Sequence, residues 1–294
     1  MKVVPGEIPT RKLHQFLLGS VSPRPICFAS TVNEKGEPNL SPFSFFNVFG
    51  SNPATLIFSP SRRVRNNTLK DTLHNVKANG EVVINMVSYS MVQQVSLASC
   101  EYPESVDEFI KSGFTKLPSE MIRPFRVAES PVQIECKVRD VIETGTGGGA
   151  GNLVICEVLM MHINEEILDA DGMIDPHKID LVARMGKDFY CRASGNAVFE
   201  VHKPNVELGI GFEQLPVAIR KSRFLTGNQL GMLANVTAIP DPDPAFTDER
   251  VKQIMQYDSN NPLIMEEELH KYAGSILDSG EVAKAWQVLL MGEV

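Results

Sequence analysis

A basic loop leads into a predicted helix in residues 61–75, which read SRRVRNNTLKDTLHN. Three arginines precede a helix start that we expect near Asn67–Thr68 or at Asp71. Basic side chains and the free backbone N–H groups of a helix N-terminus together make a site for an anion, and a monophosphate suits such a site. A solvated loop whose Asp71 simply caps the helix has the same pattern, so both interpretations stay open.

Short polar side chains alternate with phenylalanines in residues 39–47, NLSPFSFFN. The proline indicates an edge or irregular strand whose backbone groups are free to bind a ligand. Hydroxyl and amide groups beside aromatic rings suit a flat, polar, aromatic ligand. An ordinary strand explains the same residues, and the pattern alone does not separate the two interpretations.

Arg24 lies between two prolines in the sequence SPRP, residues 22–25. A guanidinium group on a stiff backbone suits an anion or a planar ligand. The alternative is an ordinary surface arginine beside a kink in the chain.

The glycine-rich stretch ETGTGGGAGN, residues 143–152, fits the dinucleotide-binding pattern G-x-G-x-x-A. That pattern binds a pyrophosphate only where the glycines lead from a strand into the N-terminus of a helix. Here strand-like sequence stands on both sides of the glycines. We therefore predict a hairpin connection and no phosphate site.

Six stretches have the composition of β-strands. They are residues 26–32, 39–49, 55–60, 81–88, 132–144 and 152–163. The fifth stretch alternates and is expected to be half-buried, whereas the sixth is apolar almost throughout and is expected to be buried on both faces. Residues 69–79 are expected to form a short amphipathic helix ended by Gly80. Residues 91–100 and 105–113 are further helix candidates, the second opening with the capping-box spacing Ser105-x-x-Glu108.

The composition changes after residue 200, where successive stretches read as helices. Thr226 and Gln229 have the spacing of a helix cap at the start of one of them. We predict a β-rich domain in residues 1–199 and a helical C-terminal extension in residues 200–294.

Composition and motifs argue against several classes of function. A net charge of −8 gives no overall attraction to nucleic acid or to anionic lipid. No signal peptide or apolar run of membrane-spanning length stands out, so a cytoplasmic protein is expected. The five cysteines show no C-x-x-C, and three of them, Cys27, Cys136 and Cys156, are interpreted as core residues. The histidines form no metal-binding motif, and G-x-S-x-G is absent.

Four segments together resemble the flavin reductase-like FMN-binding split-barrel family, in particular the longer members grouped with reductase components of two-component monooxygenases. The segments are SPRPICFASTVNEKGEPNLSPFSFFN, NNTLKDTLHNVKANGEVVINMV, RVAESPVQIECKV and IDPHKIDLVARMGKDFYCR, and they occur in the family's order. The resemblance implies a mainly β fold, a six-stranded antiparallel split barrel with peripheral helices. It also implies a homodimer with FMN at the interface. The helical extension could cap the barrel, extend the dimer contact or cover the active site.

The resemblance further implies three groups of FMN-binding residues. The first hairpin would hold the ribityl chain and the ring edge, the basic loop and helix start would hold the phosphate, and a third segment would close over the flavin from the partner subunit. In that order the residues are Arg24, Ser30, Thr31, Asn39, Ser41, Phe43 and Ser44; Arg65, Thr68, Lys70, Asp71 and Thr72; and Arg184 and Tyr190. No catalytic residue is identified.

The function that the resemblance implies is an FMN-binding oxidoreductase, with NADH or NADPH as co-substrate and with free flavin, oxygen or a partner monooxygenase as acceptor. One departure concerns Gly149-Ala150-Gly151, where shorter members often carry Gly-Asp-His before a strand with Glu-Val. That histidine approaches the flavin and the nicotinamide, so open space beside the flavin is expected at these glycines. A flavin-binding or electron-storage protein without NAD(P)H turnover is the alternative, and another planar cofactor such as heme is a third.

Overall fold

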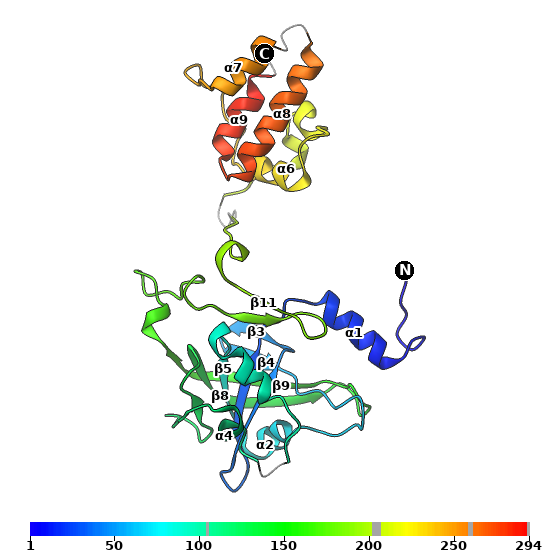
Figure 1. The fold of residues 1–294 in the computed structure, drawn as a ribbon, viewed down its shortest axis with the longest axis vertical. Coiled ribbons are helices and arrows are strands. Elements are labelled where there is room, and N and C mark those ends of the chain that lie inside the picture. The colour runs from blue at the N-terminus through cyan, green and yellow to red at the C-terminus, as the bar shows by residue number, and fades with distance from the viewer. Residues whose placement is uncertain (104–105, 202–206, 258–260, 293–294) are drawn as a thin grey trace. The chain divides into compact units, whose positions relative to one another are not determined.

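The structure is a computed structural model that describes residues 1–103, 106–201, 207–257 and 261–292. The chain divides into two compact units, Met1–Phe199 and Glu200–Val294, here named the barrel unit and the helical unit (Figure 1). Seven antiparallel strands form the main sheet of the barrel unit, in the order β2-β1-β5-β8-β9-β4-β3. Their bounds are β1 Cys27–Val32, β2 Pro38–Phe43, β3 Phe46–Ser51, β4 Ala54–Phe58, β5 Glu81–Met86, β8 Val132–Glu143 and β9 Asn152–Ile163.

The expected number of six strands is corrected to seven, because residues 39–49 form two strands and not one. β2 pairs with β1, whereas β3 pairs with β4 at the opposite end of the sheet. The chain therefore passes from one edge of the sheet to the other at Ser44 and Phe45. The rings of Phe43 and Phe58, 5.4 Å apart, pack β2 against β4, so the curled sheet brings its two edges together as a split barrel does.

The predicted hairpin in residues 132–163 is confirmed, but its pattern of burial differs from the expectation. β8 is buried on both faces over Val132–Cys136, because the loop at Glu120 and Met121 donates two backbone N–H groups to the Glu135 carboxylate. The second half of β9 exposes apolar side chains on one face, contrary to the prediction of burial on both. Those side chains are Leu159, Met161 and Ile163.

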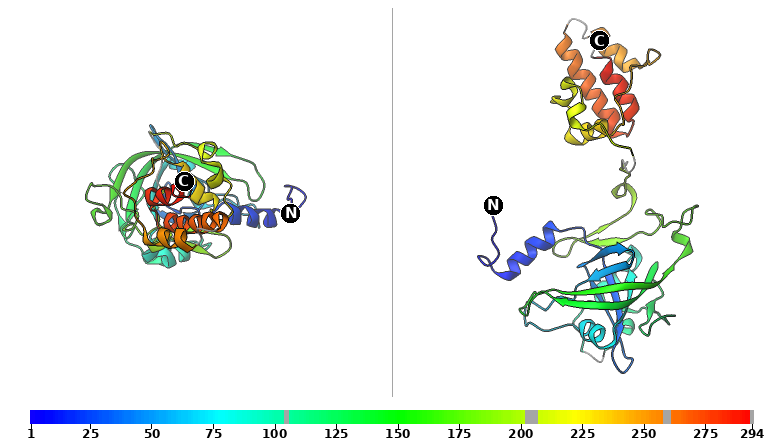
Figure 2. Two further views of the ribbon diagram at one scale, coloured as in Figure 1. Left: turned by 90° about the horizontal axis from the view of Figure 1, so that it is seen from above. Right: turned by 180° about the vertical axis from the view of Figure 1, so that it is seen from behind.

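Short helices cover the outside of the barrel unit (Figure 2). The predicted helix is confirmed as α2 (Asp71–Asn79), which ends at a left-handed Gly80. Two others also form, α3 (Val92–Leu97) and α4 (Glu108–Ser112). An additional helix was missed, α1 (Thr10–Ser20), although apolar residues at positions 13, 16 and 17 have helical spacing. None of the α1 residues is fully buried.

Two small hairpins complete the barrel unit. The first pairs β6 (Lys116–Leu117) with β7 (Arg126–Val127), and the second pairs β10 (Val182–Arg184) with β11 (Tyr190–Arg192). The β10–β11 hairpin contacts the start of the barrel, because the backbones of Arg24 and Arg184 exchange two hydrogen bonds of 2.9 Å.

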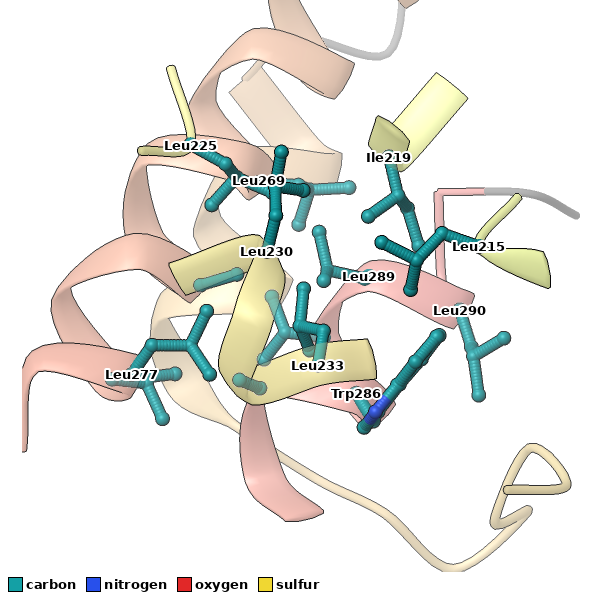
Figure 3. Packing of buried hydrophobic residues seen from close by; sticks show 14 of the residues in the cluster. Leu215, Ile219, Leu225, Leu230, Leu233, Leu269, Leu277, Trp286, Leu289 and Leu290 are labelled. Atoms are coloured by element: carbon teal, nitrogen blue, oxygen red, sulfur yellow. The ribbon is translucent and has the colours of Figure 1, made fainter. Parts of the chain in front are cut away.

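The helical unit packs its own core of leucines around Trp286 (Figure 3). Its main helices are α5 (Val217–Arg220), α6 (Gly227–Ala234), α7 (Glu249–Tyr257), α8 (Pro262–Asp278) and α9 (Val282–Leu290). The expected cap of α6 is present, since Thr226 and Gln229 form a reciprocal capping box. In the described residues no helix is long and apolar enough to cross a membrane.

Candidate functional site

The first hairpin presents most of its predicted site residues to α2. Neighbouring side chains of a strand point to opposite faces, so Thr31 lies on the side of the core that contains Cys27 and Ala29. Ser30 lies on the other side, with Phe28 and its strand partner Leu40, and its buried hydroxyl has no partner in the described structure. The structure therefore separates Ser30 from the other members of its group.

Asn39 is the centre of a partly buried hydrogen-bond network. Its side-chain oxygen accepts from Thr72 Oγ1 at 2.8 Å and from Thr31 Oγ1 at 3.4 Å. Asn75 of α2 donates to Thr31 at 3.0 Å. In the described structure Thr31, Asn39 and Thr72 thus tie β1 and β2 to α2.

Glu108 belongs to this network and was not predicted as a site residue. Its carboxylate accepts the Asn39 side-chain amide at 3.3 Å and the Leu40 backbone N–H at 3.0 Å, at the free edge of β2. Burial raises the pKa of Glu108. The spacing Ser105-x-x-Glu108 predicts a capping box, but Ser105 lies outside the described residues. The cap of α4 is Asp107, whose side chain accepts from Phe109 N at 3.0 Å.

Lys70 lies at the N-terminus of α2 with its ammonium group above the ring of Phe43, 5.2 Å from the centroid. Its Nζ is 3.4 Å from Ser41 Oγ and forms no ion pair with any described carboxylate. Burial, followed by the charge of Arg63, lowers the pKa of Lys70. A partly buried cation without an ion pair is suited to binding an anion.

The helix start adds backbone donors to this cation. Lys70 is the N-cap of α2 and no side chain caps the helix, so the interpretation of Asp71 as a simple cap is wrong. Asp71 lies in the first turn instead. The N–H groups of that turn are aligned for an anion beside Lys70.

The basic loop is bound to an acidic residue, Glu101, that no sequence motif indicates. Glu101 lies 2.8 Å from Arg65 Nη2 and 3.3 Å from Arg63 Nε, and it also faces Lys70 closely enough to act on the pKa of that residue. Arg63 donates to Thr68 Oγ1 at 2.8 Å and to a backbone carbonyl. Arg65 itself is mostly exposed, with 74% of its side-chain surface accessible.

Arg24 lies at the other end of the hairpin and is almost fully buried. Its guanidinium donates to the backbone carbonyls of Leu18, Val21 and Met185 at 2.5–2.9 Å, and more weakly to Ser44 Oγ at 3.4 Å. Most of its donors are thus committed to the protein. Arg24 fixes the end of α1 and the β10–β11 hairpin beside Ser44.

Two aromatic contacts mark this end of the site. The Arg184 guanidinium stacks on Tyr190, 4.6 Å from the ring centroid, so these two predicted residues do lie together. His14 of α1 packs edge-on against Phe45 at 6.1 Å, and burial, followed by the charge of Arg24, lowers the pKa of His14. No motif in the sequence singled out His14, because its neighbours in space come from distant segments.

The glycine-rich hairpin loop does not leave open space, which corrects the expectation for Gly149-Ala150-Gly151. Arg62 exchanges backbone hydrogen bonds with Gly149 and Ala150. A Cβ atom at Gly151 would lie 3.2 Å from Ser59 Oγ, and one at Gly148 would lie 3.1 Å from the Val64 carbonyl oxygen. Glycine is therefore required because the loop packs directly on residues 59–64, which include the first two arginines of the basic loop.

We expect Gly148→Ala to destabilise the barrel unit by about 1–3 kcal/mol, since the added methyl group meets backbone atoms that cannot rotate away. Gly147→Ala is the matched control, because a Cβ there meets nothing within 4 Å. Urea unfolding of both variants measures the difference. Equal stability of the two would show that the loop does not pack on residues 59–64.

Within the described residues no group of three or more His, Cys, Asp or Glu side chains is arranged to hold a metal ion. The donors that converge around β2 are instead an ammonium group, hydroxyls and backbone N–H groups. This set suits an organic anion with polar substituents.

Comparison with known proteins assigns the chain to a family. Residues 18–178 match the family model described as a flavin reductase like domain. An uncharacterized protein of Aquifex aeolicus is 34% identical over 201 residues, which cover 68% of this chain and 100% of that protein.

Two solved structures share the fold of the barrel unit. Nitrilotriacetate monooxygenase component B from Bacillus cereus is 27% identical with a TM-score of 0.63, covering 68% of this chain and 98% of that one. A Shewanella frigidimarina protein, provisionally described as a flavin reductase with a split barrel domain, is 24% identical with a TM-score of 0.59, covering 69% and 99%. The chain therefore belongs to the flavin reductase-like family and has its split-barrel fold.

Proposed function

We propose that the protein is a flavin oxidoreductase that binds FMN and transfers electrons from NADH or NADPH to a second acceptor. Bound FMN would supply the redox chemistry, since its ring accepts a hydride and releases electrons. The protein would bind the cofactor, orient it and control access of water to it.

The unpaired ammonium group of Lys70 is the observation that carries this proposal. Lys70, the hydroxyl of Ser41 and the first-turn N–H groups of α2 form a cationic, donor-rich end suited to a phosphate. Ser41 and Phe43, which contact the Lys70 ammonium group, lie in the half of β2 that leads to Ser44. A ligand with its phosphate at Lys70 that follows the chain onward would therefore place its ring near Phe45. The chain's own groups thus fit a phosphorylated flavin.

Backbone groups would stabilise the reduced form of the flavin ring. Because Arg24 has most of its donors bound to carbonyl groups, we assign it to positioning. Backbone N–H groups of residues 41–45 remain our proposal for stabilising negative charge on a reduced ring.

The absorption spectrum of the purified protein, followed by an assay of NADH and NADPH oxidation with added FMN, tests this function. A flavin spectrum with turnover of either nicotinamide is expected. A colourless protein that fails to bind added FMN would contradict the flavin proposal, and a spectrum typical of heme would replace it.

We expect Glu101→Gln to raise the affinity for FMN by several-fold, because Glu101 competes with the ligand phosphate for Arg63 and Arg65. The affinity for riboflavin, which has no phosphate, should not change. Fluorescence titration of both flavins measures the effect. Weaker FMN binding in this variant would mean that Glu101 holds the arginines in place for the ligand.

A flavin-binding protein without nicotinamide turnover is the second candidate. It is favoured by the observation that the hairpin loop at Gly149–Gly151 is packed on residues 59–64 and carries no imidazole. Photoreduction of the flavin without oxidation of NADH or NADPH would support it.

A homodimer with FMN at its interface also stays a proposal. Its support is the exposed apolar surface of the barrel unit, in particular Val48 and Phe49 of β3, each 64% exposed. Sedimentation equilibrium measures the assembly state.

Since the Bacillus cereus relative is a monooxygenase component, a partner monooxygenase is one proposed electron acceptor. We propose a cytoplasmic location for both proteins.

A further inference from the structure

The β10–β11 hairpin and the segment Tyr89–Leu97 enclose a cavity of about 400 Å³. One face of the hairpin lines it, since Val182 pairs with Arg192 and Arg184 pairs with Tyr190. Opposite are side chains of the Tyr89–Met91 turn and of α3. The residues from that side are Tyr89, Val92, Gln93 and Ser96.

Two stacked arginine–tyrosine pairs stand in this cavity. Arg192 lies over Tyr89, with Cζ 3.9 Å from the ring centroid, and Arg184 lies over Tyr190 at 4.6 Å. Arg192 is also held by Asp180 through two hydrogen bonds of 2.7 and 2.8 Å. Both guanidinium groups are therefore fixed before any ligand arrives, which lowers the entropy cost of binding.

These arginines have donors to spare. Asp180 engages two N–H groups of Arg192, and the Lys187 carbonyl engages one of Arg184 at 2.7 Å. A guanidinium has five N–H donors, so each keeps several that no described residue accepts. A guanidinium group that is held in place can donate two parallel hydrogen bonds to the oxygens of a phosphate.

The other lining groups suit an aromatic base with amine and hydroxyl substituents. Tyrosine rings and stacked guanidinium planes offer flat surfaces. Asp188 is an acceptor for an N–H or O–H group, while Gln93 and Ser96, both exposed on α3, can donate and accept. Because Asp180 pairs with Arg192 and Asp188 also lies at the hairpin, phosphate binding would rest on the free N–H donors of the two arginines and not on an excess of positive charge.

We propose that this cavity binds a nucleotide, with its phosphate on Arg184 and Arg192 and its base among the tyrosines. The cavity adjoins the ring end of the flavin site, because Arg184 is hydrogen-bonded through its backbone to Arg24, whose Nε donates to Ser44. Resting on the proposed function, the nucleotide is identified as the adenosine diphosphate part of a nicotinamide cofactor.

Calorimetric titration of the full chain with ADP tests the proposal. Gln93→Glu should weaken ADP binding by about tenfold and Gln93→Lys should strengthen it, since both place a charge in the cavity from an exposed helix position. Gln253→Glu, the same change at an exposed position of α7, should leave the affinity unchanged. A purely structural role of Gln93 would not produce opposite effects of opposite charges.

Three results would overturn the proposal: no ADP binding at millimolar concentration, equal affinity in both Gln93 variants, or displacement of FMN by ADP one for one. FMN binding is measured separately by absorption. ADP binding with the expected charge effects in a protein that rejects FMN would support the cavity and contradict the flavin function. FMN binding without ADP binding would support the flavin function and contradict the nucleotide site in the cavity.

Discussion

Replacing Lys70 by glutamine is expected to weaken FMN binding about 30- to 150-fold. The loss of a charge-assisted hydrogen bond in a partly buried site costs about 2–3 kcal/mol, and each 1.4 kcal/mol is a factor of ten in affinity. Lys70 has no competing ion pair with the described carboxylates, so its full charge is available to a ligand phosphate. Fluorescence titration with FMN measures the change.

Two controls make the Lys70 result specific. Riboflavin lacks the phosphate, so its affinity should be nearly the same in wild type and in Lys70→Gln. Lys35→Gln removes the same charge from the exposed turn between β1 and β2 and should have no effect on either flavin. Equal losses for FMN and riboflavin would place the phosphate elsewhere and would remove the main support for the proposed orientation.

Trp286→Ala is expected to destabilise the helical unit by about 3–5 kcal/mol, the cost of a large buried aromatic side chain. Trp286 is 1% exposed and packs among leucines of α6, α8 and α9, including Leu233 (Figure 3). Because a domain is stable by only about 5–15 kcal/mol, this unit should lose much of its stability. Urea unfolding followed by circular dichroism at the helix wavelength measures the loss.

The same variant tests where the flavin site lies. The core around Trp286 contains only residues of the helical unit, and every residue of the proposed flavin site belongs to the barrel unit. FMN affinity should therefore be unchanged in Trp286→Ala. Tyr257→Ala, at a position 79% exposed, is the control and should alter stability by no more than about 0.5 kcal/mol. Loss of FMN binding in Trp286→Ala alone would give the helical unit a role in the site.

Local sequence was sufficient for elements whose signal lies within a few residues. The capping box of Thr226 and Gln229, the end of α2 at Gly80 and the hairpin around the glycine loop all follow from such short-range rules. The division of residues 39–49 into β2 and β3 did not, because each half pairs with a different edge of the curled sheet. Strand pairing is a long-range property that composition does not encode.

The sequence by itself determined the types of residue available for a site: the hydroxyls and amides of the first hairpin, and the lysine and arginines before α2. Only the tertiary structure decided their roles. It decided that Thr31 and not Ser30 faces α2, committed most of the donors of Arg24 to backbone carbonyls and left Lys70 unpaired among the described residues.

These roles depend on contacts with residues that are distant in the sequence. Glu108 reaches Asn39 across 69 positions and Arg192 is held over Tyr89, so neither contact has a local signature. The glycines of residues 145–151 show the same limit, since their meaning comes from the backbone of residues 59–64 that packs on them. Burial and long-range pairing set the chemistry of a side chain, and both arise only when the chain folds.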